Sequence, residues 1–304
     1  MKCIFIYNPV SGKGKIAKKL DYIVAGLKEK YEEVDVYATK CSGDLAVKAK
    51  EVASQYDAIV FAGGDGSFNE VLQGVAPLEN PPELGYIPSG TVNDIAHTLK
   101  IPKNIKKALK VIQEGRREWL DCMKANNHYV MYVVAAGAFT SATYTTSQIS
   151  KNQVGRIAYF VEGVKKNLHF SVFGIDCEGQ EDRENTHSVL VSFMNSRYVA
   201  GFRVNRLSSL QDGKIEVAIV QQKIKPNFFD KIKALFSVAK LFLFGYKAKS
   251  RKGIVCLEGA SFDVDVGEDV VWNFDGEKGT SGKLHIEVLP AKIKMIVPKK
   301  LKKV

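Results

Sequence analysis

The chain has 304 residues and lacks an apolar run long enough to span a bilayer. A spanning helix needs roughly 18 to 20 consecutive apolar residues, whereas the longest candidate, residues 234–246, is interrupted by Lys240. Residues 1–7 have the pattern of a first strand, without the apolar length or small-residue cleavage site of a signal peptide. We therefore expect a protein that is neither membrane-spanning nor secreted.

Cysteine is scarce: there are five, an odd number, and no two form a CxxC pair. The five histidines show no metal-ligand spacing. These patterns argue against a disulfide scaffold and a structural zinc site, and a reducing cytoplasm is the expected compartment. Any metal should be a hard cation, held by carboxylate and carbonyl oxygens.

Acidic residues are nearly missing from two basic segments of a chain whose net charge is +11. Residues 223–252 hold nine Lys and Arg against one acid, a net charge of +8. Residues 291–304 hold six Lys and no acid, which leaves −3 for the rest of the chain. Such a localised basic surface indicates an anionic partner, which could be membrane lipid, nucleic acid or a phosphate-rich substrate. A merely solvated face explains the lysines equally well.

The length of the whole chain, 304 residues, predicts two domains. Its first part alternates short apolar strands with segments of helical periodicity. This alternation predicts an α/β N-terminal domain with a parallel sheet covered on both faces. Ligands of such sheets bind beyond the carboxyl ends of the strands. Strands are expected at residues 2–7, 34–38, 58–62 and 84–88, and helices at 16–30, 44–55, 68–76, 93–99 and 105–114.

The second part of the chain consists mainly of short strands separated by turn residues, which predicts an antiparallel β-sandwich or barrel. We expect a domain boundary near residue 124 and a second domain over residues 125–290. Whether the tail, residues 291–304, packs back on the first domain is left open. Strands are expected at residues 128–136, 187–193, 214–221, 253–256, 261–266, 270–274 and 283–289, and helices at 155–168 and 227–246.

Three predicted strands of the first domain end in loops that combine glycine with hydroxyl or amide side chains. These loops are residues 8–14 (Asn-Pro-Val-Ser-Gly-Lys-Gly), 62–70 (Ala-Gly-Gly-Asp-Gly-Ser-Phe-Asn-Glu) and 88–94 (Pro-Ser-Gly-Thr-Val-Asn-Asp). Glycine lets polyphosphate approach the backbone, and the N–H groups at a helix start attract anions. Three such loops at one sheet edge predict a nucleotide site, where Asp65 either faces the phosphates through Mg²⁺ or acts as a base.

Two familiar nucleotide-binding folds do not fit the spacing. Residues 12–17 match a G-x-G-x-x-A pattern, but Asn8 and Pro9 intervene after the strand and no acid closes the second strand at residues 38–40. The chain also has no G-x-x-x-x-G-K-[ST] motif. A Rossmann dehydrogenase is therefore poorly supported, and a P-loop enzyme is excluded.

Two Asp-Gly turns stand out in the second half of the chain. Residues 273–277 (Asn-Phe-Asp-Gly-Glu) place two carboxylates around a glycine, and one of them could act as a general base. In residues 210–214 (Leu-Gln-Asp-Gly-Lys), Asp212 could cap its turn or anchor a cation. Because Asp-Gly is a common turn dipeptide, the residues alone favour ordinary turns at both places.

Taken in order, five motifs make the chain resemble the diacylglycerol kinase catalytic-domain family, particularly its bacterial lipid kinases. The motifs are residues 7–12, 63–70, 88–94, 210–213 and 275–277. Each is modest alone, but the ordered set is specific and spans nearly the whole chain. The resemblance implies a two-domain enzyme with ATP between its domains. Residues 1–124 would be the ATP-binding domain and residues 125–290 the β-rich lipid-substrate domain.

The resemblance also implies roles for individual acids. Glu277, or Asp275 beside it, matches the acid that activates the lipid hydroxyl. Asp65, Asp94 and Asp121 match acids that organise a catalytic Mg²⁺ and its waters. The choice between Asp275 and Glu277 stays open.

A second, structural Mg²⁺ is implied by the same resemblance. It would take the carboxylate of Asp212 and the carbonyl groups of Ser209 and Lys214. Contacts to ATP are implied along the three loops and after the second strand. The implied residues are Asn8, Pro9, Val10, Ser11, Gly12, Thr39, Gly64, Asp65, Gly66, Ser67, Phe68, Asn69, Glu70, Thr91, Asp94 and Asp121.

The resulting expectation is a lipid kinase that uses ATP and Mg²⁺ and phosphorylates diacylglycerol to phosphatidic acid. Another lipid acceptor, such as phosphatidylglycerol, undecaprenol or a sphingoid base, is an alternative. A kinase of NAD or a sugar phosphate is a weaker rival that shares the Gly-Gly-Asp-Gly turn. The retained acids count against a catalytically silent lipid sensor.

The partner we expect is a lipid substrate at an anionic membrane surface, with the protein peripheral to the inner face of the membrane. Residues 227–246 interleave apolar side chains with Lys231, Lys233 and Lys240. This segment either packs between domains or presses onto anionic lipid. No nucleic acid partner is expected, because no RNA-binding or helix-turn-helix motif accompanies the charge. A homodimer is left open.

Overall fold

The computed structural model describes residues 1–138, 171–247 and 249–301. For residues 12 and 13 it describes the secondary structure and not the side chains. The chain divides into two compact units. Unit 1 comprises Met1–Cys122, Ser209–Asp212 and Leu289–Val304, and unit 2 comprises Met123–Ser208 and Gly213–Val288. Residues 209–212, expected within the second domain, belong to unit 1. The helix expected at 155–168 lies outside the described residues.

Unit 1 is built on four parallel strands in the order β4-β3-β1-β2, with β15 parallel to β4 beyond them. The two central strands β3 and β4 are buried along their whole length, as apolar runs in covered parallel sheets are. The strands are β1 (Lys2–Tyr7), β2 (Glu33–Ala38), β3 (Ala58–Gly63), β4 (Glu83–Pro88) and β15 (Leu284–Val297).

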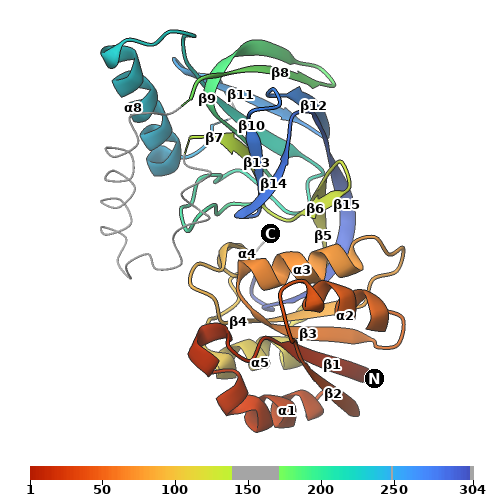
Figure 1. Ribbon diagram of the computed structural model, residues 1–304. Helices are drawn as coiled ribbons and strands as arrows, with labels where there is room; N and C mark the ends of the chain where they lie inside the picture. Colours follow the sequence, from red (N-terminus) through yellow and green to blue (C-terminus); the bar gives the residue numbers. More distant parts are fainter. Residues whose placement is uncertain (139–170, 248, 302–304) are drawn as a thin grey trace. The chain divides into compact units, whose positions relative to one another are not determined.

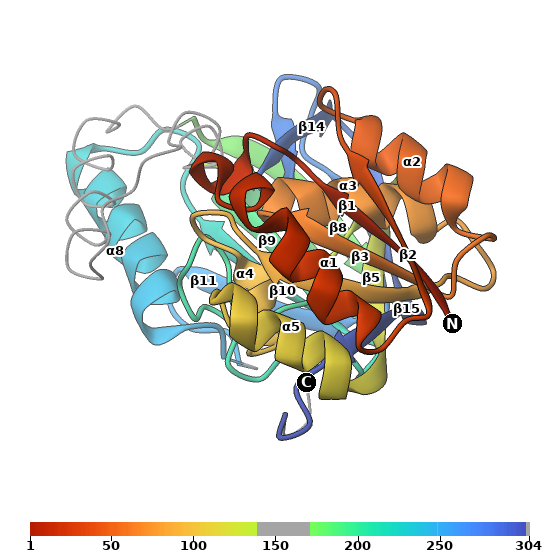
Figure 2. The same ribbon diagram turned by 90° about the horizontal axis from the view of Figure 1, so that it is seen from below.

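Helices cover both faces of this parallel sheet, α1 and α5 on one side and α2 and α3 on the other (Figures 1 and 2). The face under α1 and α5 buries a core that includes Phe5, Val60 and Ile296. The sequence pattern had predicted a helix over residues 16–30, whereas the 3-10 turn η2 (Ala17–Lys19) precedes a shorter α1. The helices are α1 (Leu20–Lys28), α2 (Asp44–Val52), α3 (Asp65–Val75), α4 (Asp94–Thr98) and α5 (Ile105–Glu114), with a 3-10 turn η1 (Ser11–Gly14) after β1.

Unit 2 is rich in antiparallel strands, and its long strand β9 pairs with three others. The first half of β9 pairs with β8, and its second half pairs with β7 on one side and β10 on the other. The unit's apolar core includes Phe193, Phe262 and Trp272. The strands are β6 (His128–Val130), β7 (Val133–Gly137), β8 (Phe173–Gly179), β9 (Arg183–Met194), β10 (Ile215–Gln221), β11 (Ile254–Gly259), β12 (Ser261–Asp265), β13 (Val271–Phe274) and β14 (Glu277–Ser281).

These observations confirm the expected fold class, a parallel α/β region followed by an antiparallel β-rich region. Three strands were missed: β5 (Arg116–Ala125), β8 and β14. The expected helix at 227–246 is present as α8 (Phe228–Phe244). Within the described ranges, no helix has the length and apolar character needed to cross a membrane.

Helices α2 and α3 approach each other closely at Gly74. A Cβ atom placed there would lie 2.6 Å from the carbonyl oxygen of Ala46 and 2.9 Å from the Cβ atom of Ala49. Real Cβ atoms essentially never come within 3.0 Å of another heavy atom, so any larger residue must push the two helices apart.

We expect Gly74→Ala to lower the free energy of unfolding by about 1–3 kcal/mol, because overpacking outweighs the gain in helix propensity. Gly174→Ala is the matched control: nothing lies within 4 Å of its added Cβ atom, so the change should stay within about 0.5 kcal/mol. Urea unfolding of both variants measures this. Equal midpoints for the two would contradict the close helix contact.

Candidate functional site

The three glycine-containing loops lie at the carboxyl ends of adjacent strands of unit 1. Strands β1, β3 and β4 are neighbours and parallel, so their ends meet at one sheet edge. The Oγ atoms of Ser11 and Ser89 lie 3.1 Å apart and form a hydrogen bond between the first and third loops. The N–H of Ser89 also donates to the carbonyl oxygen of Gly63 at 2.8 Å. The expected juxtaposition of the loops is therefore present.

Glycine is required where the second and third loops touch. A Cβ atom on Gly90 would lie 2.5 Å from the Cα atom of Gly64, and one on Gly64 would lie 3.1 Å from the Cα atom of Gly90. Two backbones can approach this closely only without side chains. These glycines therefore serve loop-to-loop packing, a role that the motif alone did not reveal.

Asp65 is the first residue of α3, and its carboxylate binds the start of α4. It accepts the backbone N–H groups of Asn93 and Asp94, each at 2.7 Å. Burial raises the pKa of the Asp65 carboxyl, while these N–H groups and the charge of Lys103 oppose the rise. Asp65 thus joins the second loop to the third.

Asn93 adopts a left-handed backbone with φ of 60° and is fully buried. Its side-chain Oδ1 atom accepts the N–H of Gly90 at 3.0 Å, and its Nδ2 atom donates to the carbonyl oxygen of Gly90 at 2.8 Å. The hydroxyl of the buried Tyr86 donates to the same Oδ1 atom at 3.2 Å. Asn93 was not predicted as a site residue, yet its amide fixes the shape of the third loop.

Three of the predicted ATP contacts have structural roles in α3. Phe68 is buried, and its ring packs against the rings of Phe61 and Tyr86 with centroids 5.5 Å and 5.4 Å away. Asn69 is also buried, and Glu70 accepts the N–H of Leu45 in the first turn of α2 at 3.2 Å. A contact from Phe68 to ATP would therefore have to come from its backbone.

The first loop is a hydrogen-bonded turn at the end of β1. The side chain of Asn8 accepts the N–H of Val10 at 3.0 Å, and its carbonyl oxygen accepts the N–H of Ser11 at 3.1 Å. Val10 is 78 % exposed. Thr39, which follows β2, donates its N–H to the carbonyl oxygen of Tyr7 at 2.9 Å and thus lies beside this loop. Pro9 and Gly12 belong to the same turn, and Gly66 and Ser67 are half-buried in the first turn of α3.

Lys103 is a charged residue at this edge that is not among the predicted site residues. Its Nζ atom donates to the carbonyl oxygen of Thr91 in the third loop at 2.8 Å. Lys103 is exposed, and its charge opposes the raised pKa of Asp65. It lies outside every motif because a bond to a backbone oxygen twelve residues earlier leaves no pattern in the sequence.

The two other predicted catalytic Mg²⁺ acids are both buried. Asp94 begins α4 and is 1 % exposed, and Asp121 on β5 is 3 % exposed. The Oδ1 atom of Asp121 accepts the N–H of Ala291 at 2.8 Å. Ala291 has a φ of 49°, so Asp121 stabilises a strained point in β15.

Two of the three residues predicted for the structural Mg²⁺, Ser209 and Asp212, belong to unit 1. Asp212 accepts the N–H of Ser209 at 3.2 Å within unit 1, whereas Lys214 belongs to unit 2. Carboxylate and carbonyl oxygens are suitable donors for Mg²⁺. Across the described part of the chain, no group of three or more His, Cys, Asp and Glu side chains could hold a metal ion. Both metal sites remain predictions.

Asp275 and Glu277, the two candidates for the general base, differ sharply in their surroundings. Asp275 is 3 % exposed, and its carboxylate accepts three backbone N–H groups, those of Met131 at 2.6 Å, Tyr132 at 2.9 Å and Val133 at 3.0 Å. Glu277 is exposed at the start of β14. Asp275 therefore holds its turn in place, while Glu277 is accessible for chemistry.

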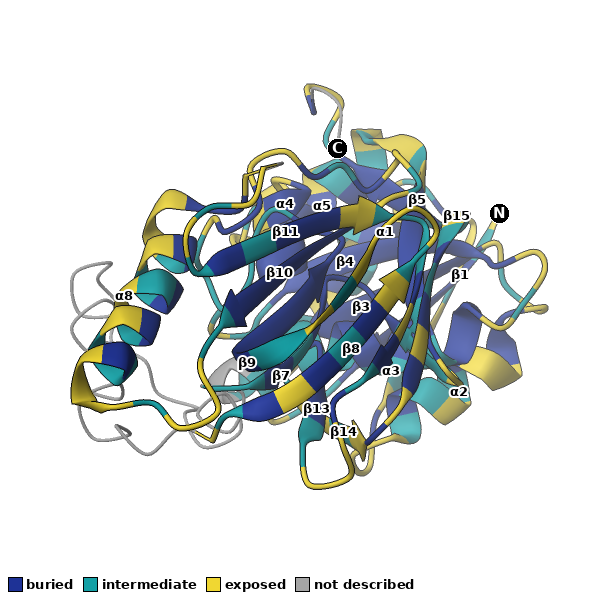
Figure 3. Cartoon of the chain, turned by 90° about the horizontal axis from the view of Figure 1, so that it is seen from above, coloured by how far each residue is buried: buried dark blue, intermediate teal, exposed yellow. Residues whose placement is uncertain are grey.

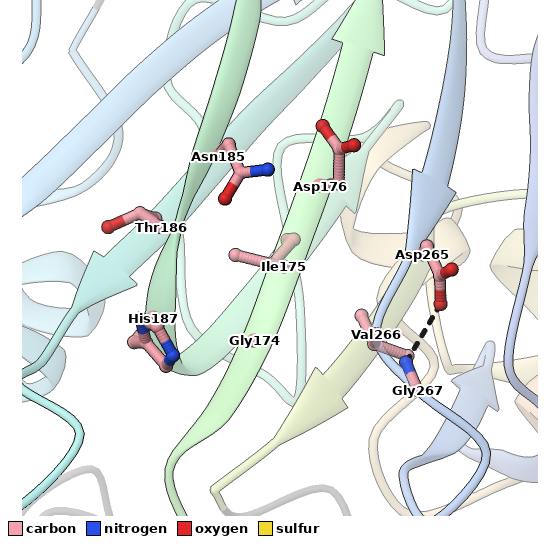
Figure 4. A pocket seen from close by; sticks show the side chains of 9 residues that line it. All are labelled: Gly174, Ile175, Asp176, Asn185, Thr186, His187, Asp265, Val266 and Gly267. Carbon is pink, nitrogen blue, oxygen red and sulfur yellow. Dashed lines mark hydrogen bonds between the residues drawn. The ribbon is translucent and has the colours of Figure 1, made fainter.

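A shallow depression of about 370 Å³ lies elsewhere, over β8, β9 and β12 of unit 2 (Figure 4). Arg183 donates to both carboxylate oxygens of Asp176 there, at 3.1 Å and 2.8 Å, and lowers the pKa of that carboxyl. Asp265 accepts the N–H of Gly267 at 2.9 Å. None of the predicted site residues lines this depression.

Known proteins resemble this chain along most of its length. The family model "Diacylglycerol kinase catalytic domain" matches residues 2–125. A diacylglycerol kinase of Bacillus subtilis (strain 168) is 34 % identical over 279 residues, covering 90 % of this chain and 89 % of its own length. One from Staphylococcus epidermidis (strain ATCC 12228 / FDA PCI 1200) is 32 % identical over 298 residues, covering 94 % and 91 %.

Solved structures show the same fold. A crystal structure of a Bacillus anthracis str. Sterne protein superposes with a TM-score of 0.80 at 26 % identity and covers 97 % of this chain and 96 % of its own. The chain belongs to the diacylglycerol kinase catalytic-domain family, which confirms the resemblance drawn from its motifs. The relatives and the fold support a diacylglycerol kinase-like lipid kinase.

We expect Asp275→Ala to lower the free energy of unfolding by about 3 kcal/mol or more, because three buried N–H groups lose their acceptor. Glu277→Ala removes an exposed side chain and should change it by less than about 0.5 kcal/mol. Urea unfolding compares the two variants directly. If the Asp275 variant were as stable as the Glu277 variant, the structural role of Asp275 would be wrong.

Proposed function

We propose that this protein transfers the γ-phosphoryl group of ATP to the hydroxyl of diacylglycerol, giving phosphatidic acid. The observation that carries the proposal is the N-terminus of α3, at the edge where the three loops meet. Its N-cap is Gly64, which has no side chain to accept hydrogen bonds from the first turn. Such N–H groups, together with the helix dipole, favour a phosphate.

The loops are tied to one another, so the groups that would hold the triphosphate are fixed before it binds. Phosphoryl transfer depends mainly on positioning and on neutralising charge. We assign the triphosphate to the N–H groups of Asp65, Gly66 and Ser67. Lys103 adds a positive charge beside them, given its bond to the third loop.

The carboxylate oxygens of the acids in this region are suitable ligands for Mg²⁺. It usually keeps several waters and takes only one or two carboxylates, and Asp65 and Asp94 begin adjacent helices. We assign these two acids, with Asp121, to the ion and its waters. When bound, the ion supplies charge neutralisation on the phosphoryl oxygens.

Glu277 is the residue that we assign as the general base. Its exposed carboxylate could accept the proton of a lipid hydroxyl, a role that typically contributes 10²–10⁴-fold to the rate. Asp275 is a positioning residue in this proposal, because its carboxylate already binds three N–H groups of the chain.

We expect radiolabelled phosphate from ATP to enter diacylglycerol in a panel that also contains monoacylglycerol, undecaprenol, sphingosine, phosphatidylglycerol and NAD. Glu277→Gln should lower kcat by about 10²–10⁴-fold without changing the unfolding midpoint. Glu181→Gln, an exposed acid of unit 2, is the control and should keep wild-type turnover. If only another lipid were labelled, that lipid and not diacylglycerol would be the acceptor. If only NAD were labelled, the lipid-kinase proposal would be overturned.

Lys103→Gln should raise the KM for ATP at least about tenfold with a smaller effect on kcat, since a hydrogen bond to a charged group contributes roughly 1.5–3 kcal/mol. Lys106→Gln, on the exposed side of α5, is the matched control. Steady-state kinetics with varied ATP measures both. Asp65→Ala is a less specific probe, because it also removes the acceptor for two N–H groups of α4. Equal KM values for the two lysine variants would show that Lys103 does not contact ATP.

A further inference from the structure

Helix α8 of unit 2 has one face that packs inward and another that is exposed. Its buried residues are Asp230, Ala234, Val238 and Leu241, at helical spacing, and the helix packs against β10. In Figure 3 the opposite face of α8 is marked as exposed along its length. Packing against β10 thus accounts for the apolar residues on the buried face of α8 and not for those on its exposed face.

The exposed face carries a regular stripe of large apolar side chains. Phe229, Phe236 and Leu243 are 71 %, 62 % and 46 % exposed and follow one another at seven-residue intervals. Seven residues are almost two helical turns, so the three side chains line up along one side. Lys233 and Lys240 are also exposed and seven residues apart, beside this line. We call these five residues the α8 stripe.

The apolar surface extends beyond the stripe at both ends of the helix. Phe228 and Phe244 are 63 % and 61 % exposed, and Ile224, between two lysines just before the helix, is 65 % exposed. Exposed apolar residues gathered in this way mark a surface that meets an apolar partner. Scattered apolar residues elsewhere on the surface would not.

The charge of the same segment identifies the partner. Residues 223–252 carry a net charge of +8, and neither Lys233 nor Lys240 forms an ion pair with an acid of the described residues. A second copy of the chain would bring the same positive charge against itself. A helix with lysines alternating with exposed phenylalanines suits the boundary of an anionic bilayer, where the lysines meet headgroups and the phenylalanines enter the acyl region.

We infer that the α8 stripe is the surface by which this protein docks on an anionic lipid bilayer. The helix would lie in the plane of the membrane surface, since none of the described helices can span it. The inference deepens the proposed function by naming the element that brings the enzyme to its membrane-embedded substrate. It does not depend on which lipid is phosphorylated.

The test is sedimentation with vesicles of phosphatidylcholine alone or with added phosphatidylglycerol, without nucleotide. The full chain should bind only the anionic vesicles, less tightly as salt rises. Phe229→Ser with Phe236→Ser should weaken binding at least about tenfold. Lys233→Gln with Lys240→Gln should weaken it about 25-fold, because each lysine near such a surface contributes about fivefold.

Matched controls come from exposed residues of unit 1. Lys106→Gln with Lys107→Gln removes the same charge from α5, and Tyr22→Ser with Val47→Ser removes apolar residues that are 49 % and 67 % exposed. Both control pairs should bind vesicles like the wild type. Thermal unfolding of every variant should stay at the wild-type midpoint, since all the changed side chains are exposed.

Wild-type vesicle affinity in either stripe variant would overturn the inference. It would also be overturned if light scattering showed a dimer that the phenylalanine variant converts to monomer while its vesicle affinity is unchanged. Phosphorylation of detergent-dispersed diacylglycerol separates the two proposals. Stripe variants should keep that activity, whereas its absence in the wild type would count against the proposed function alone.

Discussion

The bond between Asp65 and the start of α4 holds together the region in which we propose the nucleotide site. The carboxylate accepts two N–H groups of the third loop while its own residue begins α3. The amide of Asn93, the hydroxyl of Tyr86 and the glycine contact between Gly64 and Gly90 maintain the same arrangement. An acid expected to organise Mg²⁺ therefore also determines where the neighbouring backbone lies.

The fold was largely predictable because alternating strands and helices leave a strong periodic signal. The missed strands show where that signal ends. Strand β14 (Glu277–Ser281) is mostly exposed and has no apolar alternation, and β5 begins with Arg116, Arg117 and Glu118. Strand β8 does alternate, with Phe173, Ile175 and Cys177 buried, so it was detectable by the same criterion.

The candidate site was predictable at the level of loops and less so at the level of side chains. A family motif does not separate residues that contact a ligand from residues that support the loop. Phe68 packs in the core and Glu70 caps α2, although both lie within the most specific motif. Asp275 and Glu277 are two residues apart, and the burial of Asp275 with its three bound N–H groups distinguishes it from the exposed Glu277. Lys103 left no sequence signal because its partner is a backbone oxygen.

The cross-linked loops have a consequence for the thermodynamics of ligand capture. Ordering a mobile loop around a triphosphate would cost conformational entropy at the moment of association. Here Ser11 is already bonded to Ser89, and Asn93 to Gly90, so the ordering that these bonds provide occurs when unit 1 folds. Under the proposed function, nucleotide would therefore enter a preorganised cradle, with association limited by encounter rather than by loop rearrangement.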